Sequence, residues 1–183
     1  MRLRGGFVSK NSGTKKRPGR ARRSSLLKLT STSEDQTREI GRSIGALARQ
    51  GTVIALNGEL GAGKTVLAKG IAQGLGVQED VISPSYVLMN IYPGHLNLYH
   101  FDFYRLENEE ELLELGLEEY FYGDGVVVVE WAEKFSGILP AKRLEIEMKK
   151  SPEDPDSSRD LYVQLQGSLR LFSLKELEKR CCF

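Results

Sequence analysis

Apolar residues recur with the helical period of about 3.6 residues in two stretches of the chain. The first follows Ser33, which forms a capping box with Gln36, and it runs to about residue 50 with one apolar face: Ile40, Ile44, Leu47 and Ala48. The second covers residues 66–75 and ends before Gly76. The pattern therefore predicts two amphipathic helices, with Gly51 ending the first.

Between and after these helices lie runs of β-prone residues. Residues 52–56 and 126–129 are apolar throughout, which is typical of strands covered on both faces. Two further runs, 87–92 and 96–103, are joined at Pro93-Gly94, so they predict an antiparallel hairpin. The remaining expected strands are a short one near residues 26–29 and two alternating runs at 143–148 and 161–165. We therefore expect an α/β fold with a mixed parallel and antiparallel sheet flanked by helices.

Residues 107–119 are rich in glutamate, with leucines interleaved and Gly116 as an expected stop. This composition predicts one short acidic helix. Its charges can form a solvated face or a docking surface for a basic partner, and the sequence favours neither.

The segment from Gly58 to Thr65 reads Gly-Glu-Leu-Gly-Ala-Gly-Lys-Thr and fills the pattern G-x-x-x-x-G-K-[ST] between an expected strand and an expected helix. Glycines at 58, 61 and 63 permit a tight turn with backbone amides directed at an anion. The helix opening near Gly63 adds the positive end of its dipole. We expect Lys64 to reach the β- and γ-phosphates of a nucleotide and the Thr65 hydroxyl to bind Mg²⁺.

Three polar residues beyond the loop are candidates for the same site. Ser85, in Ser-Pro-Ser-Tyr, is either a sensor of the γ-phosphate or part of an ordinary turn. Asp102 and Glu130 each follow a predicted strand, where carboxylates of nucleotide sites usually lie, and Glu130 is the expected Mg²⁺ ligand. His100 has no second His or Cys at metal spacing, so we interpret it as a structural hydrogen-bonding residue.

Charge divides the chain into two parts that its net charge of +1 conceals. Residues 1–28 hold ten of the 26 basic residues and none of the 25 acidic ones, which leaves 16 basic and 25 acidic residues in the remainder. Residues 1–24 have few large apolar side chains, so we expect a disordered basic extension followed by one domain, 25–183. The extension is interpreted as a passive tail or overextended start, an RNA-contacting arm, or an organelle transit peptide.

Cysteine content and hydropathy bear on location. Cys181 and Cys182 are adjacent, which suits neither a disulfide framework nor a metal site, so two reduced thiols in a cytoplasmic protein are expected. No apolar stretch approaches the ~20 residues that span a bilayer, so no membrane association is expected.

Taken together, the motifs resemble the bacterial TsaE (YjeE) family over about residues 26–166. The resemblance is carried by the phosphate loop and by five further motifs: Ser83-Pro-Ser-Tyr86, His100-Phe-Asp-Phe-Tyr-Arg-Leu106, the Glu-Glu-Leu helix, Glu130-Trp131 and Leu139-Pro140. It implies a small P-loop NTPase fold with ATP and Mg²⁺ as cofactors. It also implies weak ATPase activity in tRNA threonylcarbamoyladenosine biosynthesis, alongside TsaB and TsaD type proteins, with tRNA contacted through them.

The resemblance also assigns roles to individual residues. Nucleotide binding falls to the loop and its flank, Gly58, Gly61, Ala62, Gly63, Lys64, Thr65 and Val66, with Glu34, Glu133 and Arg159 approaching the nucleotide. Thr65 and Glu130 become the Mg²⁺ ligands. Lys64, Asp102 and Ser85 become the catalytic group, with Asp102 handling water and Ser85, in place of the more common Thr, acting as a switch.

We expect hydrolysis of Mg-ATP to act as a conformational switch on a TsaB–TsaD type complex. No internal arginine finger stands out, so slow turnover and activation by partners are expected. The alternatives are a nucleotide-gated binding module, in which hydrolysis is incidental, and a small-molecule kinase. A kinase lid with clustered arginines is not recognisable in the sequence, which disfavours the last.

Overall fold

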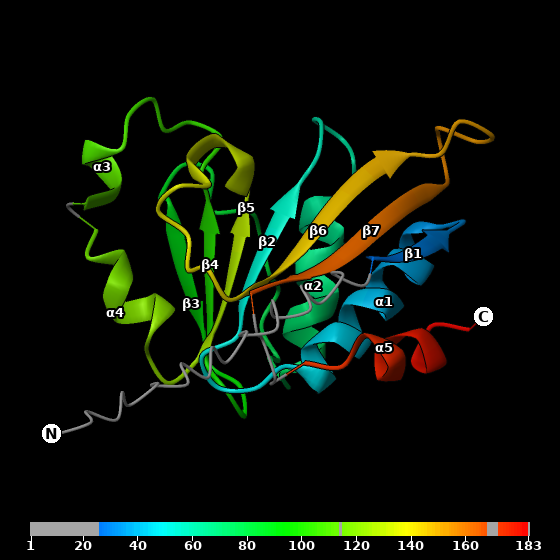
Figure 1. Ribbon diagram of the computed structural model, residues 1–183, viewed down its shortest axis with the longest axis horizontal. Coiled ribbons are helices and arrows are strands. Elements are labelled where there is room, and N and C mark those ends of the chain that lie inside the picture. Colours follow the sequence, from blue (N-terminus) through cyan, green and yellow to red (C-terminus); the bar gives the residue numbers. More distant parts are fainter. Residues whose placement is uncertain (1–25, 114, 168–171, 183) are drawn as a thin grey trace, which may run out of the picture.

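The computed structural model describes residues 26–113, 115–167 and 172–182 (Figure 1). The predicted basic extension, residues 1–24, lies outside this part of the chain, so its disorder stays a prediction. In chain order the elements are β1 (Leu26–Ser31), α1 (Glu34–Leu47), β2 (Val53–Asn57), α2 (Lys64–Gly74), β3 (Met89–Tyr92), β4 (Leu98–Asp102), α3 (Glu110–Leu113), α4 (Leu117–Phe121), β5 (Val126–Glu130), the 3₁₀ helix η1 (Ala132–Phe135), β6 (Arg143–Lys150), β7 (Arg159–Gln166) and α5 (Leu174–Arg180).

These strands form a seven-stranded sheet in the order β1-β7-β6-β2-β5-β4-β3. The four central strands, β6, β2, β5 and β4, are parallel, whereas β3, β7 and β1 pair antiparallel at the two sides. The expected hairpin is present as the β3–β4 pair. The predicted mixed sheet is therefore confirmed, with its parallel centre where β2 delivers the chain to the phosphate loop.

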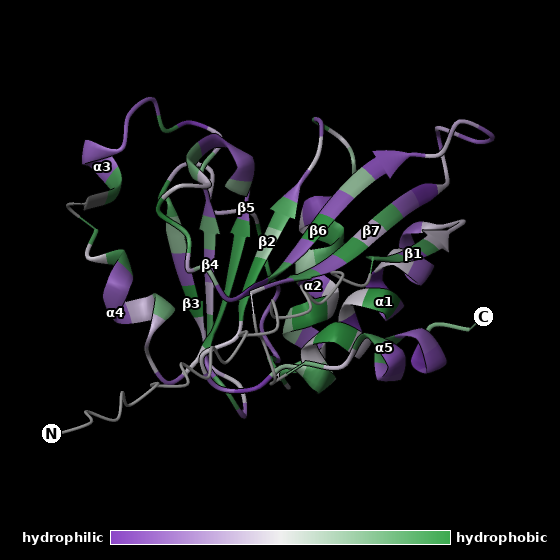
Figure 2. Ribbon diagram, in the orientation of Figure 1, coloured by the Kyte–Doolittle hydropathy of each residue, from purple (hydrophilic) through white to green (hydrophobic). Residues whose placement is uncertain are grey.

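Two hydrophobic layers cover the sheet, and β5 contributes to both. Val126 and Val128 face the layer formed with α1, α2 and α5, while Val127 and Val129 face the layer formed with α4 and η1. All four valines are fully buried, as their uninterrupted apolar run predicts. Figure 2 shows the same contrast, with apolar central strands and hydrophilic residues on α3 and α5.

Helices α1 and α2 pack with their backbones in contact, because glycines meet at the crossing. A β-carbon on Gly70 would lie 2.1 Å from the Arg38 carbonyl oxygen, and one on Gly45 would lie 2.1 Å from the Ile71 oxygen. Real β-carbons do not approach so closely, so any side chain here would separate the helices. Since α2 begins at the phosphate loop, this contact fixes the loop relative to the start of α1.

The acidic stretch differs from its prediction. One helix was expected over residues 107–119, but the structure contains two short helices, α3 and α4. The reason is Gly116, which adopts φ 61° as the residue before α4 and is incompatible there with a continuous right-handed helix. Helix α5, which no pattern predicted, packs on α1 and β1, and it places Cys181 in the core while Cys182 stays exposed, both as free thiols.

Candidate functional site

The phosphate-loop motif forms a tight turn between β2 and α2. Gly58, Gly61 and Gly63 have φ values of 134°, 77° and 98°, in the region that favours glycine. A β-carbon on Gly58 would also lie 2.3 Å from the Met148 carbonyl oxygen, so this glycine is required for close packing against β6. The turn places the start of α2 at the floor of a hollow in the surface.

That hollow is a cavity of about 790 Å³, a size that accommodates a nucleotide. Its floor is the loop and the start of α2, one wall is the start of α1 with the segment before β7, and the opposite wall comes from the ends of β4 and β5. The lining residues are Thr32, Ser33, Glu34, Thr37, Leu60, Gly61, Ala62, Gly63, Lys64, Thr65, Val66, Ser83, Ser85, Tyr86, Asp102, Tyr104, Arg105, Glu130, Trp131, Asp156, Ser157 and Arg159.

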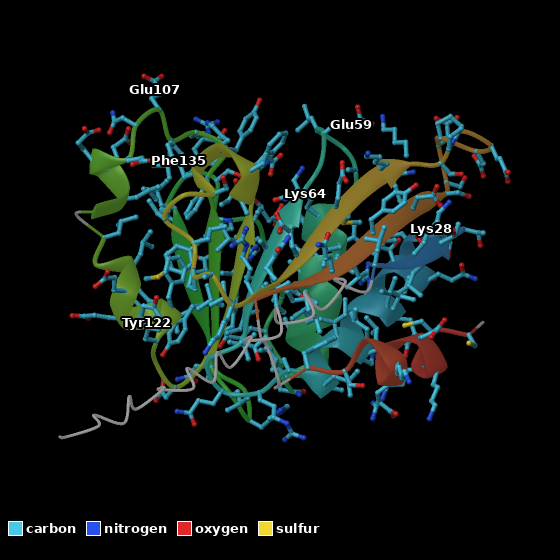
Figure 3. The ribbon with its side chains drawn as sticks, viewed as in Figure 1. Lys28, Glu59, Lys64, Glu107, Tyr122 and Phe135 are labelled. Carbon is cyan, nitrogen blue, oxygen red and sulfur yellow. The ribbon has the colours of Figure 1, made fainter. Side chains whose placement is uncertain are left out.

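Lys64 is the first residue of α2, directly after the loop that follows β2 (Figure 3). Its ammonium donates to the carbonyl oxygens of Gly58 and Glu59, and it sits 3.7 Å from the centroid of the Trp131 ring. Burial lowers the pKa of Lys64 from its usual 10.5, while the carboxylates of Glu133 and Glu130 oppose that shift. A buried cation of this kind favours an anionic ligand, which supplies the charge compensation that water no longer gives.

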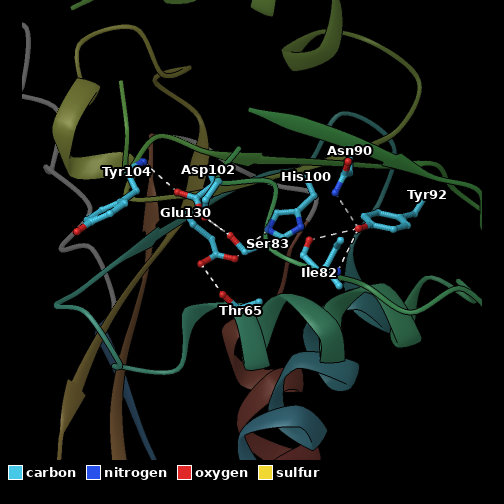
Figure 4. Close-up of polar contacts among 10 residues, drawn as sticks. Thr65, Ile82, Ser83, Asn90, Tyr92, His100, Asp102, Tyr104 and Glu130 are labelled. Carbon is cyan, nitrogen blue, oxygen red and sulfur yellow. Dashed lines mark hydrogen bonds and ion pairs between the residues drawn. The ribbon is translucent and has the colours of Figure 1, made fainter. Parts of the chain in front are cut away.

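Thr65 and Glu130 meet across the cavity floor, one from α2 and one from the end of β5. The Thr65 hydroxyl donates to Glu130 Oε2 at 2.9 Å, and Glu130 is 2% exposed (Figure 4). A hydroxyl beside a carboxylate is an oxygen donor set suited to Mg²⁺, which usually takes few protein ligands and completes its shell with phosphate and water oxygens. No cluster of three or more His, Cys, Asp or Glu side chains that could hold a metal occurs in the described ranges. The two residues thus fit a nucleotide-associated Mg²⁺ ion.

Asp102 lies beside Glu130 on the neighbouring strand and is held by three donors. Both Ser83 and Ser85 direct their hydroxyls at Asp102 Oδ2, Ser85 at 2.6 Å, and the Tyr104 amide donates to Oδ1 at 2.9 Å. The two hydroxyl oxygens are themselves 2.6 Å apart, but each has a single proton, so donation to Asp102 leaves none for a bond between them. The Ser-Pro-Ser segment is therefore attached to the site mainly through one carboxylate oxygen.

Most of the residues predicted from sequence line this cavity. Glu34 lies at its α1 end, and Arg159 lies on the same side, where its guanidinium donates to the carbonyl oxygens of Pro155 and Ser158 at 2.9 and 2.8 Å. Two predicted residues do not line it. Gly58 and Glu133 are joined instead by a 3.3 Å bond from the Gly58 amide to Glu133 Oε1, beneath the loop. Their proposed approach to nucleotide stays a prediction.

Several residues that line the cavity were not predicted from sequence as site residues, among them Ser83, Tyr86, Arg105 and Trp131. Arg105 lines the cavity with its guanidinium carbon 3.9 Å from the centroid of the Tyr86 ring, so it is an arginine at the rim of the site. All four belong to motifs already noted for their resemblance, and that neighbourhood was the available signal. The position of the Trp131 ring could not be predicted, because it depends on a φ of 58°, which is unusual for a bulky residue and turns the ring towards Lys64.

Comparison with known proteins shows the family of this chain. Residues 31–161 match the family described as "Threonylcarbamoyl adenosine biosynthesis protein TsaE". The chain belongs to the TsaE family. Among its TsaE relatives are the tRNA threonylcarbamoyladenosine biosynthesis proteins of Bacillus subtilis, 44% identical over 70% of this chain and 80% of the relative, and of Treponema pallidum, 41% identical over 67% and 91%.

The TsaE fold is also seen in a solved structure. The crystal structure of Bacillus subtilis YdiB superposes with a TM-score of 0.68 and 34% identity, covering 88% of this chain and 95% of that one. The small α/β fold of the P-loop type predicted from sequence is thereby confirmed. As in the sequence prediction, the described ranges contain no helix with the length and apolarity needed to cross a bilayer.

Proposed function

We propose that this chain binds Mg-ATP in the cavity beside α2 and hydrolyses it slowly as a step of tRNA threonylcarbamoyladenosine biosynthesis. The observation that carries the proposal is the convergence of Lys64, the Thr65–Glu130 pair and Asp102 on one cavity at the start of α2. Nucleotide phosphates bind at such helix starts because the free amides and the helix dipole both favour negative charge. The TsaE relatives supply the tRNA-modification context.

The residues at the two ends of the cavity indicate how the nucleotide is oriented in it. Metal and water ligands belong at the γ-phosphate, and the candidates for both, Glu130 and Asp102, lie on the β5–β4 side. The nucleoside then extends to the opposite side, where Glu34 and Arg159 line the wall. Lys64 lies between the two ends, where it can leave the loop carbonyls for phosphate oxygens.

Each side chain has a task in this scheme. Thr65 and Glu130 would hold Mg²⁺, which would supply positive charge to offset that of the phosphate oxygens. Asp102 Oδ1 accepts only the Tyr104 amide in the described structure, so it retains a lone pair able to orient a water. Lys64 offsets the charge that develops on the transferred phosphoryl group.

Slow turnover is expected from the position of the arginines. Arg159 is occupied by backbone carbonyls, and Arg105 stacks on Tyr86 at the rim. Both guanidinium groups therefore already have partners within the chain. We propose that a TsaB–TsaD type complex completes the site or restrains the Ser83–Tyr86 segment, so that nucleotide state and complex state are coupled.

The proposal is tested by single-turnover ATP hydrolysis with Lys64→Ala, measured with and without TsaB and TsaD type partners. Removing the phosphate-binding cation should lower the rate at least about a hundredfold. Lys69→Ala is the matched control, because Lys69 lies on the same helix outside the cavity. Normal hydrolysis by Lys64→Ala would refute the site. Partner regulation that depends on ATP binding but persists without hydrolysis would instead identify a nucleotide-gated binding module.

A further inference from the structure

His100 is a fully buried histidine that the proposed mechanism does not use. It lies on β4, where its Nε2 is 2.9 Å from Glu130 Oε1 (Figure 4). Its other ring nitrogen, Nδ1, is buried and has no hydrogen-bond partner among the described residues. The histidine therefore makes one side-chain hydrogen bond in this part of the chain, and it makes that bond to the expected metal ligand.

Strand register explains why this histidine reaches Glu130. Asp102 is paired directly with Glu130, whereas His100 is paired with Val128, two residues earlier on both strands. Because side chains alternate along a strand, His100 and Asp102 point to the same face, towards α2. Asp102 is thus the lateral neighbour of Glu130, and His100 approaches it diagonally from beneath.

The hydrogen bond determines the roles of the two ring nitrogens. A carboxylate can only accept, so Nε2 carries the proton and Nδ1 carries the lone pair. This assignment leaves the buried, unpartnered atom as an acceptor, which avoids burying an unpaired N–H donor. His100 is consequently a dedicated donor to Glu130.

Both oxygens of Glu130 are then occupied by protein groups. Oε1 accepts from His100 and Oε2 accepts from Thr65, each at 2.9 Å. Because both of its carboxylate oxygens are hydrogen-bonded, Glu130 loses its rotamer freedom when the protein folds and not when the ligand binds. Its remaining lone pairs face the cavity in one fixed orientation, which is the condition for tight binding of a metal with strict geometry.

We infer that His100 is a positioning residue that orients the Glu130 carboxylate for Mg²⁺. The inference rests on the proposed function, because it requires Glu130 to act at the metal. It assigns His100 no contact with nucleotide or metal. A histidine that merely filled space in the core would instead affect folding and all forms of nucleotide binding alike.

The test compares the dissociation constant of a fluorescent ATP analogue with Mg²⁺ and with EDTA. His100→Leu removes the donor and should weaken Mg²⁺-dependent binding by about tenfold or more, while binding in EDTA changes by less than about twofold. His100→Gln, which can still present an N–H to Glu130, should retain most of the Mg²⁺ effect. If His100→Leu does not fold, His100→Asn, whose amide is too short to reach Glu130, provides the same test.

Two further variants make the outcomes distinguishable. Tyr92→Phe is the matched control, because Tyr92 is a buried polar residue on the adjacent strand that bonds Ile82 and Asn90 but not Glu130. It should leave the ratio of the dissociation constant in EDTA to the dissociation constant in Mg²⁺ unchanged. Glu130→Gln should reduce that ratio, and a ratio unaffected by Glu130→Gln would overturn the proposed metal site itself.

Two results would refute the inference about His100 while leaving the proposed metal site intact. The first is a normal Mg²⁺ effect in His100→Leu or His100→Asn when Glu130→Gln loses it. The second is an equal loss in His100→Gln and His100→Leu, which would show that the hydrogen bond is not what positions the carboxylate. Thermal unfolding of each variant, measured in parallel, identifies losses that come from the fold.

Discussion

Replacing Gly70 with alanine sets two physical effects against each other. Alanine is favoured over glycine inside a helix by about 1 kcal/mol, so propensity alone predicts a more stable α2. Packing predicts the reverse, because the new β-carbon would lie 2.1 Å from the Arg38 carbonyl oxygen and 2.9 Å from the Gly41 α-carbon. Ordinary contact begins at 3.4 Å, so the helices must separate by about 1 Å or more.

Overpacking of this severity costs about 3 kcal/mol, at the upper end of the range for buried insertions. Subtracting the gain in helix propensity leaves a net destabilisation of about 2 kcal/mol. For a domain of this size, that corresponds to a melting temperature lower by about 4–8 °C. The separation should also weaken ATP binding, since α1 carries Glu34 and α2 carries Lys64 on different sides of the same cavity.

Urea unfolding and thermal scans measure the effect. Gly137→Ala is the matched control, because its β-carbon would meet nothing within 4 Å and its backbone has no positive φ. That control should be neutral or slightly stabilising, by up to about 1 kcal/mol. A Gly70→Ala protein as stable as Gly137→Ala would refute the claim that backbone contact fixes the two helices.

Two further outcomes are expected. Lys28 lies 2.9 Å from Asp160 and lowers the pKa of that carboxyl from 3.8. The ion pair therefore stabilises the fold above about pH 4, and this contribution is lost as the pH falls. Asp160→Asn should be less stable than wild type at pH 7, and urea unfolding from pH 7 to 3 should show the difference in the free energy of unfolding between the two proteins becoming smaller. Ser85→Ala should lower the single-turnover ATPase rate about tenfold, as for loss of one hydrogen bond to a charged group. A larger loss in the matched Ser83→Ala variant would transfer the switch role to Ser83.

Local pattern sufficed for much of this fold. The β5 valines, the glycine-rich turn and the capped start of α1 each express a rule within a few residues, and each was predicted in place. The division of the acidic stretch depended on Gly116 adopting φ 61°, a backbone angle that sequence allows but does not require. Helix α5 was missed because its stability comes from packing on α1 and β1, which periodicity over so short a helix does not reveal.

The site shows the same limit. Lys64 and Thr65 follow from the loop motif, whereas the bond between Thr65 and Glu130 joins residues 65 positions apart and depends on strand order. Glu133 illustrates the difference: its approach to the nucleotide, implied by the resemblance, stays a prediction, whereas its bond with the Gly58 amide beneath the loop could not be read from the sequence. Contacts set by register, such as His100 with Glu130, require the sheet topology before they can be recognised.

Two bulky residues, Leu88 and Trp131, have φ values of 66° and 58°, and Trp131 lines the cavity. Each such backbone costs about 1–2 kcal/mol, so the surroundings must hold it in place. Glycine would relieve this strain but would remove the Trp131 ring from Lys64. A laboratory selection for heat resistance should consequently accumulate substitutions at these two positions, and those at Trp131 should yield more stable proteins that bind ATP less well. At Trp131, in the wall of the cavity, adaptation to temperature and retention of the proposed activity therefore compete.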